Sequence, residues 1–187
     1  YDSFEPGTMD HAAYGVKVLF DEGMIRRFLP DDKWDSIIYT AIAHHSDYEL
    51  PEISDPQTLL HAKLIRDEDK LDNCRVKLVD STSTFINVSE EELGTQNITQ
   101  KVYETVFKNK CILSADRVTQ MDYWVSYIVY FFDINFKESF DIIAENDYLN
   151  RIIDRIPYSN PSTKKQMEKN RTYMQKFINS HTGNRLS

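Results

Sequence analysis

The sequence predicts an all-α fold, and three features of the chain lead to that prediction. Apolar residues recur at helical spacing along almost the whole chain, and β-type alternation of polar and apolar residues is rare. Glycine, which disfavours helices, occurs only five times in 187 residues. Two pairs, Asp55-Pro56 and Asn160-Pro161, combine a capping residue with a proline suited to the first helical position.

These signals predict seven helices, at about residues 10–29, 32–45, 56–78, 90–108, 115–132, 137–156 and 161–182. Thr8 or Asp10 can cap the first helix, and one of the aspartates at 31–32 can cap the second. The third helix starts at Asp55-Pro56. The segment 81–88 has the weakest helix signals, so we expect a loop or a short extended piece there.

The later helices have start or stop signals of their own. Ser89 and Glu92 fit a capping box that opens the fourth helix. Ser114 precedes the fifth helix, which is the most apolar. Pro157 stops the sixth helix, and Asn160-Pro161 opens the seventh.

Composition limits the classes of protein and partner. No repeat or linker interrupts the chain, so we expect a single all-helical domain over 1–187. The net charge of −8 disfavours binding to nucleic acid, because phosphate backbones carry the same sign. Cys74 and Cys111 are too few for a disulfide scaffold and are compatible with a reducing cytoplasm. The apolar run at 123–132 is about half the ~20 residues of a membrane span, and no signal peptide is evident. We expect a cytoplasmic protein that binds neither membrane nor nucleic acid.

Two adjacent histidines are the first candidates for a functional site. The apolar run that ends in A-I-A-H-H-S, at 41–46, places His44 and His45 at the end of the second helix. Their side chains point about 100° apart around the helix axis, so one helix-end interaction cannot account for both. The alternative is helix capping together with surface exposure.

A third histidine, His11, lies near the start of the first helix. It follows Asp10, and Gly15 lies one turn later, where a missing side chain permits close approach of another helix. Taken alone, a histidine here belongs to the helix start more often than to a ligand set. We interpret His61 and His181 as structural or surface residues.

The acidic run R-D-E-D-K-L-D-N at 66–73 is a further candidate. Asp67 and Asp69 are two positions apart, so they cannot both face the core of a helical protein. With Leu64 and Leu71 facing inward, one carboxylate must lie beside that face, where it needs a partner or a metal ion. The alternative is a solvated helix face whose carboxylates pair with basic neighbours. Imidazoles together with a carboxylate suit Fe, Mn or Zn, and one metal site would account for all these features.

The three segments together resemble the HD-domain metal-dependent phosphohydrolases. D-H-A-A-Y-G at 10–15 is similar to the D-H-x-x-x-G helix start of members with two metals. A-I-A-H-H at 41–45 is similar to the end of the helix that follows in those members. I-R-D-E-D-K-L-D at 65–72 is similar to the family's final metal segment, with Glu68 in the place of the usual alanine. The resemblance covers residues 9–78 and is weaker in the helical tail.

The resemblance implies an HD-like helical bundle, with a metal-site segment over 1–80 and a helical extension over 81–187 packed on it. It implies one or two divalent ions (Fe, Mn or Zn) and the metal ligands His11, His44, His45 and Asp69. Of these ligands, Asp69, His44 and His45 would be catalytic. Lys70 and Arg66 would contact a phosphate, unless they are surface ion-pair partners. The family's first histidine and its His-Asp pair do not occur in this chain, and we expect them before Tyr1 unless the protein is a degenerate relative.

The function that the resemblance implies is hydrolysis of a nucleotide or another small phosphate ester by a metal-activated water. S-D-Y-E-L-P-E at 46–52 lacks the glycine-tyrosine-proline signature of cyclic-dinucleotide phosphodiesterases with this fold. The alternative is a catalytically inactive helical module with a regulatory or partner-binding role. The aromatic residues at 123–132 could serve such a role, although core packing also explains them. A homodimer is compatible with either function.

Overall fold

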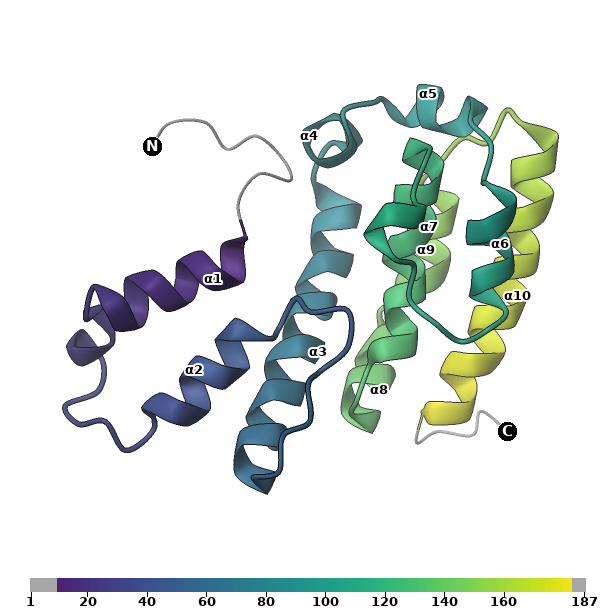
Figure 1. Ribbon diagram of the computed structural model, residues 1–187. Helices are drawn as coiled ribbons and strands as arrows, with labels where there is room; N and C mark the ends of the chain where they lie inside the picture. Colours follow the sequence, from purple (N-terminus) through teal and green to yellow (C-terminus); the bar gives the residue numbers. More distant parts are fainter. Residues whose placement is uncertain (1–9, 183–187) are drawn as a thin grey trace. The chain divides into compact units, whose positions relative to one another are not determined.

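The computed structural model describes residues 10–182, which form two compact units divided between Asp69 and Lys70 (Figure 1). Unit 1 precedes this division, and unit 2 follows it. Both are helical, and the described residues contain no strand, so the all-α prediction is confirmed. That the two units act as one domain stays a prediction. No helix between residues 10 and 182 is both long enough and apolar enough to cross a membrane.

The described residues form ten α-helices and four short 3-10 or π-helical turns. The α-helices are α1 (His11–Val16), α2 (Asp35–Ala43), α3 (Pro56–Val79), α4 (Thr82–Ile86), α5 (Glu90–Thr95), α6 (Gln100–Val106), α7 (Gln120–Val129), α8 (Lys137–Glu145), α9 (Tyr148–Asp154) and α10 (Pro161–His181). The π-helical turn is η1 (Lys17–Asp21), and the 3-10 turns are η2 (Met24–Arg27), η3 (Ser114–Asp116) and η4 (Tyr130–Asp133). Helix α3 runs through the division between the units.

The start of α1 follows the sequence prediction, but its end does not. The side chain of Asp10 accepts hydrogen bonds from two backbone N–H groups of the first turn, both at 3.0 Å. The helix continues only through η1, because Gly23 adopts a left-handed conformation with φ 73°. The expected helix to Leu29 is therefore wrong beyond Asp21. Thr8, the other expected cap, lies outside the described residues.

The two helices that follow differ in how they begin. Helix α2 starts after Trp34 without a side-chain cap, so the caps expected at 31–32 are wrong. The Asp55 side chain accepts hydrogen bonds from the backbone N and the Oγ1 of Thr58, at 2.7 and 2.6 Å, which confirms the predicted start of α3. These bonds lower the pKa of the Asp55 carboxyl. The stability that they contribute is therefore lost as the pH falls through that lowered value.

In unit 1, α1 and α2 lie side by side, as Figure 1 shows. Their contact buries small side chains, with Ala12 and Ala41 almost inaccessible to solvent. Gly15 faces Ile42, as its position near a second helix suggested. A Cβ added at Gly15 would lie 3.4 Å from the Ile42 Cγ2, an ordinary contact, so the packing leaves room for a methyl group.

Unit 2 has an extensive apolar core built around α7 and α10. Trp124 of α7 is completely buried, and α10 runs alongside α8 and α9 (Figure 1). The buried positions of α10 recur every three or four residues, as expected of a helix with one face in a core. They are Thr163, Met167, Asn170, Met174 and Ile178. Asn160 caps this helix by accepting hydrogen bonds from the backbone N of Ser162 and Thr163, as predicted.

One short helix and two helix breaks in unit 2 were not predicted. The segment 81–88 contains the short helix α4, which ends where Asn87 adopts φ 59°. The helix expected over 90–108 breaks at 96–99 between α5 and α6, although Ser89 caps its start as predicted. The helix expected over 137–156 breaks at Asp147, which has φ 52°.

The aromatic stretch at 123–132 belongs mainly to the core of unit 2. Trp124 and Phe131 are buried, and only Tyr123 is exposed among its large aromatic residues. The ammonium group of Lys77 lies 4.0 Å from the ring centre of Phe85 and 4.2 Å from that of Tyr127, which are cation–π distances. Core packing therefore accounts for most of this stretch.

A single carboxylate joins the starts of α6 and α7. Asp122 is fully buried, and its two oxygens accept hydrogen bonds from the backbone N of Thr99, Val118 and Thr119 at 2.8, 3.0 and 3.1 Å. The Thr119 hydroxyl accepts in return from the Asp122 backbone N, which completes a capping box. Helix α7 therefore starts at Gln120, and the expected start after Ser114 is wrong, with only the 3-10 turn η3 there.

We predict that Asp122→Ala lowers the free energy of unfolding by roughly 2–4 kcal/mol, because three backbone donors lose a charged acceptor. Urea denaturation of both proteins measures the change. Asp72→Ala is the matched control, since Asp72 pairs with Arg75 and their side chains are 62% and 57% exposed. An exposed pair contributes at most about 1 kcal/mol. Equal losses in the two variants would contradict the anchoring role of Asp122.

We also predict that Gly94→Ala is destabilising by roughly 1–3 kcal/mol, because overpacking forces the backbone to move. A Cβ at Gly94 would lie 2.3 Å from the Pro157 carbonyl oxygen. The control is Gly15→Ala, where the added methyl fits and alanine is the better helix former by about 1 kcal/mol. Thermal unfolding should show a lower Tm for Gly94→Ala and an equal or higher Tm for Gly15→Ala. A tolerated Gly94→Ala would contradict the close approach at Pro157.

Candidate metal centre

His11 and His45 meet in unit 1, where α1 begins and α2 has just ended. Their Nε2 atoms lie 2.9 Å apart, and their rings meet edge to face with centroids 4.8 Å apart. The contact of α1 with α2 brings together these two residues, which are 34 positions apart. His11 is exposed and His45 is half-buried, so this contact lies near the surface.

A hydrogen bond from Nδ1 of His45 determines which of its ring nitrogens has the lone pair. Nδ1 lies 2.7 Å from the Ile42 carbonyl oxygen, which can only accept, so Nδ1 carries a proton. In the neutral imidazole, Nε2 is then the unprotonated nitrogen, and it faces His11. Metal-binding histidines commonly donate their second N–H to a carbonyl or carboxylate in this way.

His44 is held by a different partner. Its Nδ1 lies 2.6 Å from Oδ2 of Asp47, one turn further along the chain. The carboxylate accepts from Nδ1, so in the neutral ring Nε2 again has the free electron pair. Sequence reasoning missed Asp47, although its spacing of three residues from His44 was a usable signal. The two adjacent histidines therefore offer two separate ligand positions.

The two residues expected to contact phosphate are both engaged in the structure. Arg66 is 1% exposed, and its Nη1 donates to the carbonyl oxygens of His44, His45 and Asp47. The Lys70 ammonium lies 2.8 Å from Oδ2 of Asp133, within unit 2. Their role toward a substrate stays a prediction.

Burial varies sharply along the acidic run of α3. Asp67 is fully buried, Asp69 is half-buried and Glu68 is exposed. Leu64 is 45% exposed, so the expectation that it faces inward is wrong. The buried charged residues show that this run is not simply a solvated helix face. Burial identifies Asp67 as the carboxylate that needs a charged partner, whereas the resemblance assigns the metal ligand to Asp69.

The separation of the two Nε2 atoms is compatible with a hydrogen bond between the rings and also with a shared metal ion. Two nitrogens about 2.0–2.1 Å from one metal lie roughly 2.9 Å apart at a right angle and roughly 3.4 Å apart at a tetrahedral angle. The observed separation of 2.9 Å lies at the short end of that range. Within residues 10–182, no group of three or more His, Cys, Asp or Glu side chains is placed to hold a metal. The pair would therefore supply two ligands of a set.

Neither cysteine has the properties of a metal-binding thiolate. Burial raises the pKa of Cys74 to about 12, so its thiol stays protonated at neutral pH. The Sγ of Cys111 lies 3.5 Å from the Val129 carbonyl oxygen, to which it can donate.

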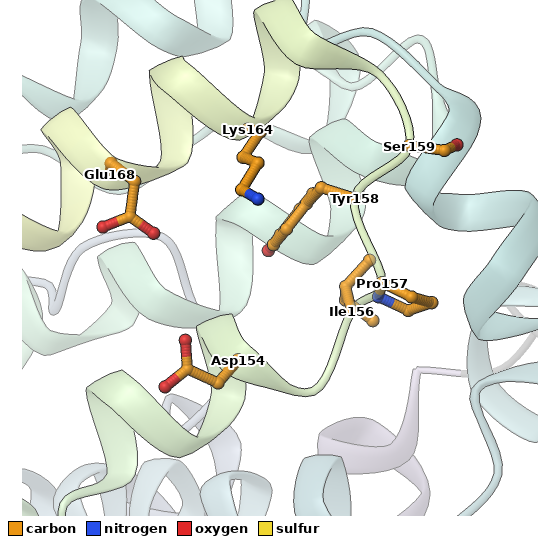
Figure 2. Close-up of a pocket in the computed structure, with 7 residues that line it drawn as sticks. All are labelled: Asp154, Ile156, Pro157, Tyr158, Ser159, Lys164 and Glu168. Atoms are coloured by element: carbon orange, nitrogen blue, oxygen red, sulfur yellow. The ribbon is translucent and has the colours of Figure 1, made fainter.

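Unit 2 contains a pocket of about 420 Å³ between the end of α9 and the first turns of α10 (Figure 2). Lys164 and Glu168 reach it from α10, Asp154 from the end of α9, and Tyr158 from the loop between these helices. Arg171 pairs with both carboxylates, so the charges of the lining residues largely cancel. Sequence reasoning did not find this pocket, because its lining comes from a loop and two helix ends without a common motif.

The structure predicts the tautomer of His45 in the metal-free protein. Because Nδ1 donates to Ile42, long-range ¹H–¹⁵N spectra of the neutral ring should show the proton on Nδ1 and a pyridine-like Nε2. His61, which is exposed on α3, provides the reference for a solvent-averaged ring. A His45 ring protonated on Nε2 would contradict the geometry described.

The chain was also compared with known proteins. No family model, no curated protein and no solved structure matches it. Any function assigned to the histidine cluster, which consists of His11, His44 and His45, must therefore be argued from the chemistry of these residues.

Proposed function

We propose that the protein is a metal-dependent phosphohydrolase of the HD type, acting on a nucleotide or another small phosphate ester. The observation that carries the proposal is the contact between His11 and His45, with Nε2 atoms 2.9 Å apart. At this separation the two neutral imidazoles either form an N–H···N hydrogen bond or bind a common cation.

The hydrogen bonds around the cluster support the proposal. His45 donates from Nδ1 to a carbonyl and His44 from Nδ1 to a carboxylate, which leaves both Nε2 atoms as electron-pair donors. The segments 10–15 and 41–45, which resemble the two metal-site additions of the HD family, each supply one ring to the contact. A coincidence would have to explain the contact and the two orienting hydrogen bonds together.

The orientation of each histidine determines which ion it would bind. His11 and His45 would share one ion, while His44, held by Asp47, would serve a second ion or a substrate oxygen. Asp69 remains the proposed carboxylate ligand, with the rest of the set from residues outside the cluster. A divalent Fe, Mn or Zn ion bound there would activate a water and offset charge on a phosphoryl group. We place the protein in the cytoplasm, where its two thiols would stay reduced.

The test begins with metal binding by the chain. Isothermal titration with Zn²⁺ and Mn²⁺ should show binding that His45→Ala weakens more than about 100-fold, since even changes to residues around the ligands cost about 10–100-fold. Turnover of nucleoside monophosphates and p-nitrophenyl phosphate is then measured with the same metals. We expect His45→Ala and Asp69→Ala to abolish it.

His61→Ala is the matched control, because His61 is an exposed histidine of α3 outside the cluster. It should leave both affinity and turnover unchanged. Unaltered metal content and turnover in His45→Ala and Asp69→Ala would end the proposal. Tight metal binding that depends on His45 but comes with no phosphatase activity would favour the regulatory helical module instead.

A further inference from the structure

The buried guanidinium of Arg66 organises the turn that carries both adjacent histidines. Its Nη1 donates to the carbonyl oxygens of His44, His45 and Asp47, at 3.0, 3.3 and 2.8 Å. The residue is 1% exposed, so water does not compete for these bonds at that atom. One nitrogen thus contacts three of the four peptide carbonyls between His44 and Asp47.

The end of α2 explains why a cation is useful there. The last carbonyls of a helix have no intrahelical donor and carry partial negative charge. Many helices meet this need with a glycine in the left-handed conformation, but no glycine follows α2. The chain turns through the C-cap residue His44, which has φ −113° and ψ 8°. Arg66 binds the carbonyl of this residue and those of His45 and Asp47 in the turn that follows α2.

We propose that Arg66 is a positioning residue, which fixes the turn at 44–47 and thereby directs the imidazoles of His44 and His45. It acts through their backbone carbonyls and does not contact a phosphate. The consequence for metal binding rests on the proposed function, whereas the consequence for ring orientation does not.

The chemistry of arginine suits this role better than that of lysine. The guanidinium is planar, always charged, and rigid over four heavy atoms, so two N–H bonds of Nη1 can be shared among several acceptors in a fixed plane. An ammonium on a flexible stem carries the same charge but does not hold three carbonyls in one arrangement. Arg66→Lys therefore separates the geometry from the charge.

The first measurement uses the metal-free chain. Imidazole ¹H–¹⁵N spectra of Arg66→Lys should show shifted signals for His44 and His45, and an unchanged signal for His61. Arg75→Lys is the matched control, because Arg75 is exposed on the same helix and pairs only with Asp72 among the described side chains, at 2.8 Å. It should leave all three signals unchanged. Unshifted His44 and His45 signals in a folded Arg66→Lys protein would overturn the proposal.

The second measurement is the Zn²⁺ affinity of the same variants, together with binding of inorganic phosphate. Loss of positioning should weaken Zn²⁺ binding by about 10–100-fold, as is typical when residues that orient ligands are changed. Weaker phosphate binding with unaltered histidine signals would instead make Arg66 a substrate contact and overturn the proposal. If the unaltered chain binds no Zn²⁺ while the histidine signals still shift, the proposed function fails and the positioning role stands.

A measurement on the unaltered protein keeps the proposal testable if Arg66→Lys does not fold. Three carbonyl acceptors should restrict rotation of the Arg66 guanidinium, so its Nη1 protons should be resolved and slow to exchange at low temperature. The Nη protons of Arg75, which is exposed, should be averaged. An Arg66 signal averaged like that of Arg75 would overturn the proposal.

Discussion

The carbonyl groups of the turn that follows α2, at 44–47, are the constraint on which the positions of His44 and His45 depend. His44 is the C-cap of α2, and His45 and Asp47 lie in the turn after it. Arg66 donates from one nitrogen to the carbonyls of all three residues. Because the acceptors belong to the backbone of His44, His45 and Asp47, the arginine sets the path of the chain. The side chains of the histidines then need only short-range partners to become fixed.

The two units stabilise themselves by different means. Unit 2 buries large side chains such as Trp124, Phe131 and Met174 in one apolar core. In unit 1 the described buried apolar residues are fewer and mostly small, so they remove less surface from water. They are Ala12, Val16, Ile25, Ala41 and Ala62. Polar contacts therefore contribute a larger share of the order in unit 1, and the candidate site lies in the unit where such contacts determine geometry.

Helix starts could be predicted from the sequence because the capping groups are local. Asp10, Asp55 and Asn160 each bond to backbone N–H groups two or three residues further on, within the reach of a motif. The interruptions at Asn87 and Asp147 could not be predicted, because these residues take left-handed conformations for which glycine is the usual sequence signal. The start of α7 also escaped prediction, since Asp122 binds Thr99 across 23 residues.

The candidate site, like the helices, could be predicted from the sequence only in part. The helical context of His11 and of the histidine pair was readable, and so was the rule that Asp67 and Asp69 face different ways. The sequence did not show which of them is buried, because that depends on tertiary packing. For Arg66 the sequence suggested either a phosphate contact or a surface ion pair, yet the residue is almost inaccessible to solvent. A buried guanidinium is stable only where its charge and donors are matched, and the end of α2 supplies both carbonyl acceptors and a favourable dipole. The three carbonyl acceptors that stabilise the buried guanidinium of Arg66 occupy both N–H groups of Nη1. This nitrogen therefore has no donor left for a substrate.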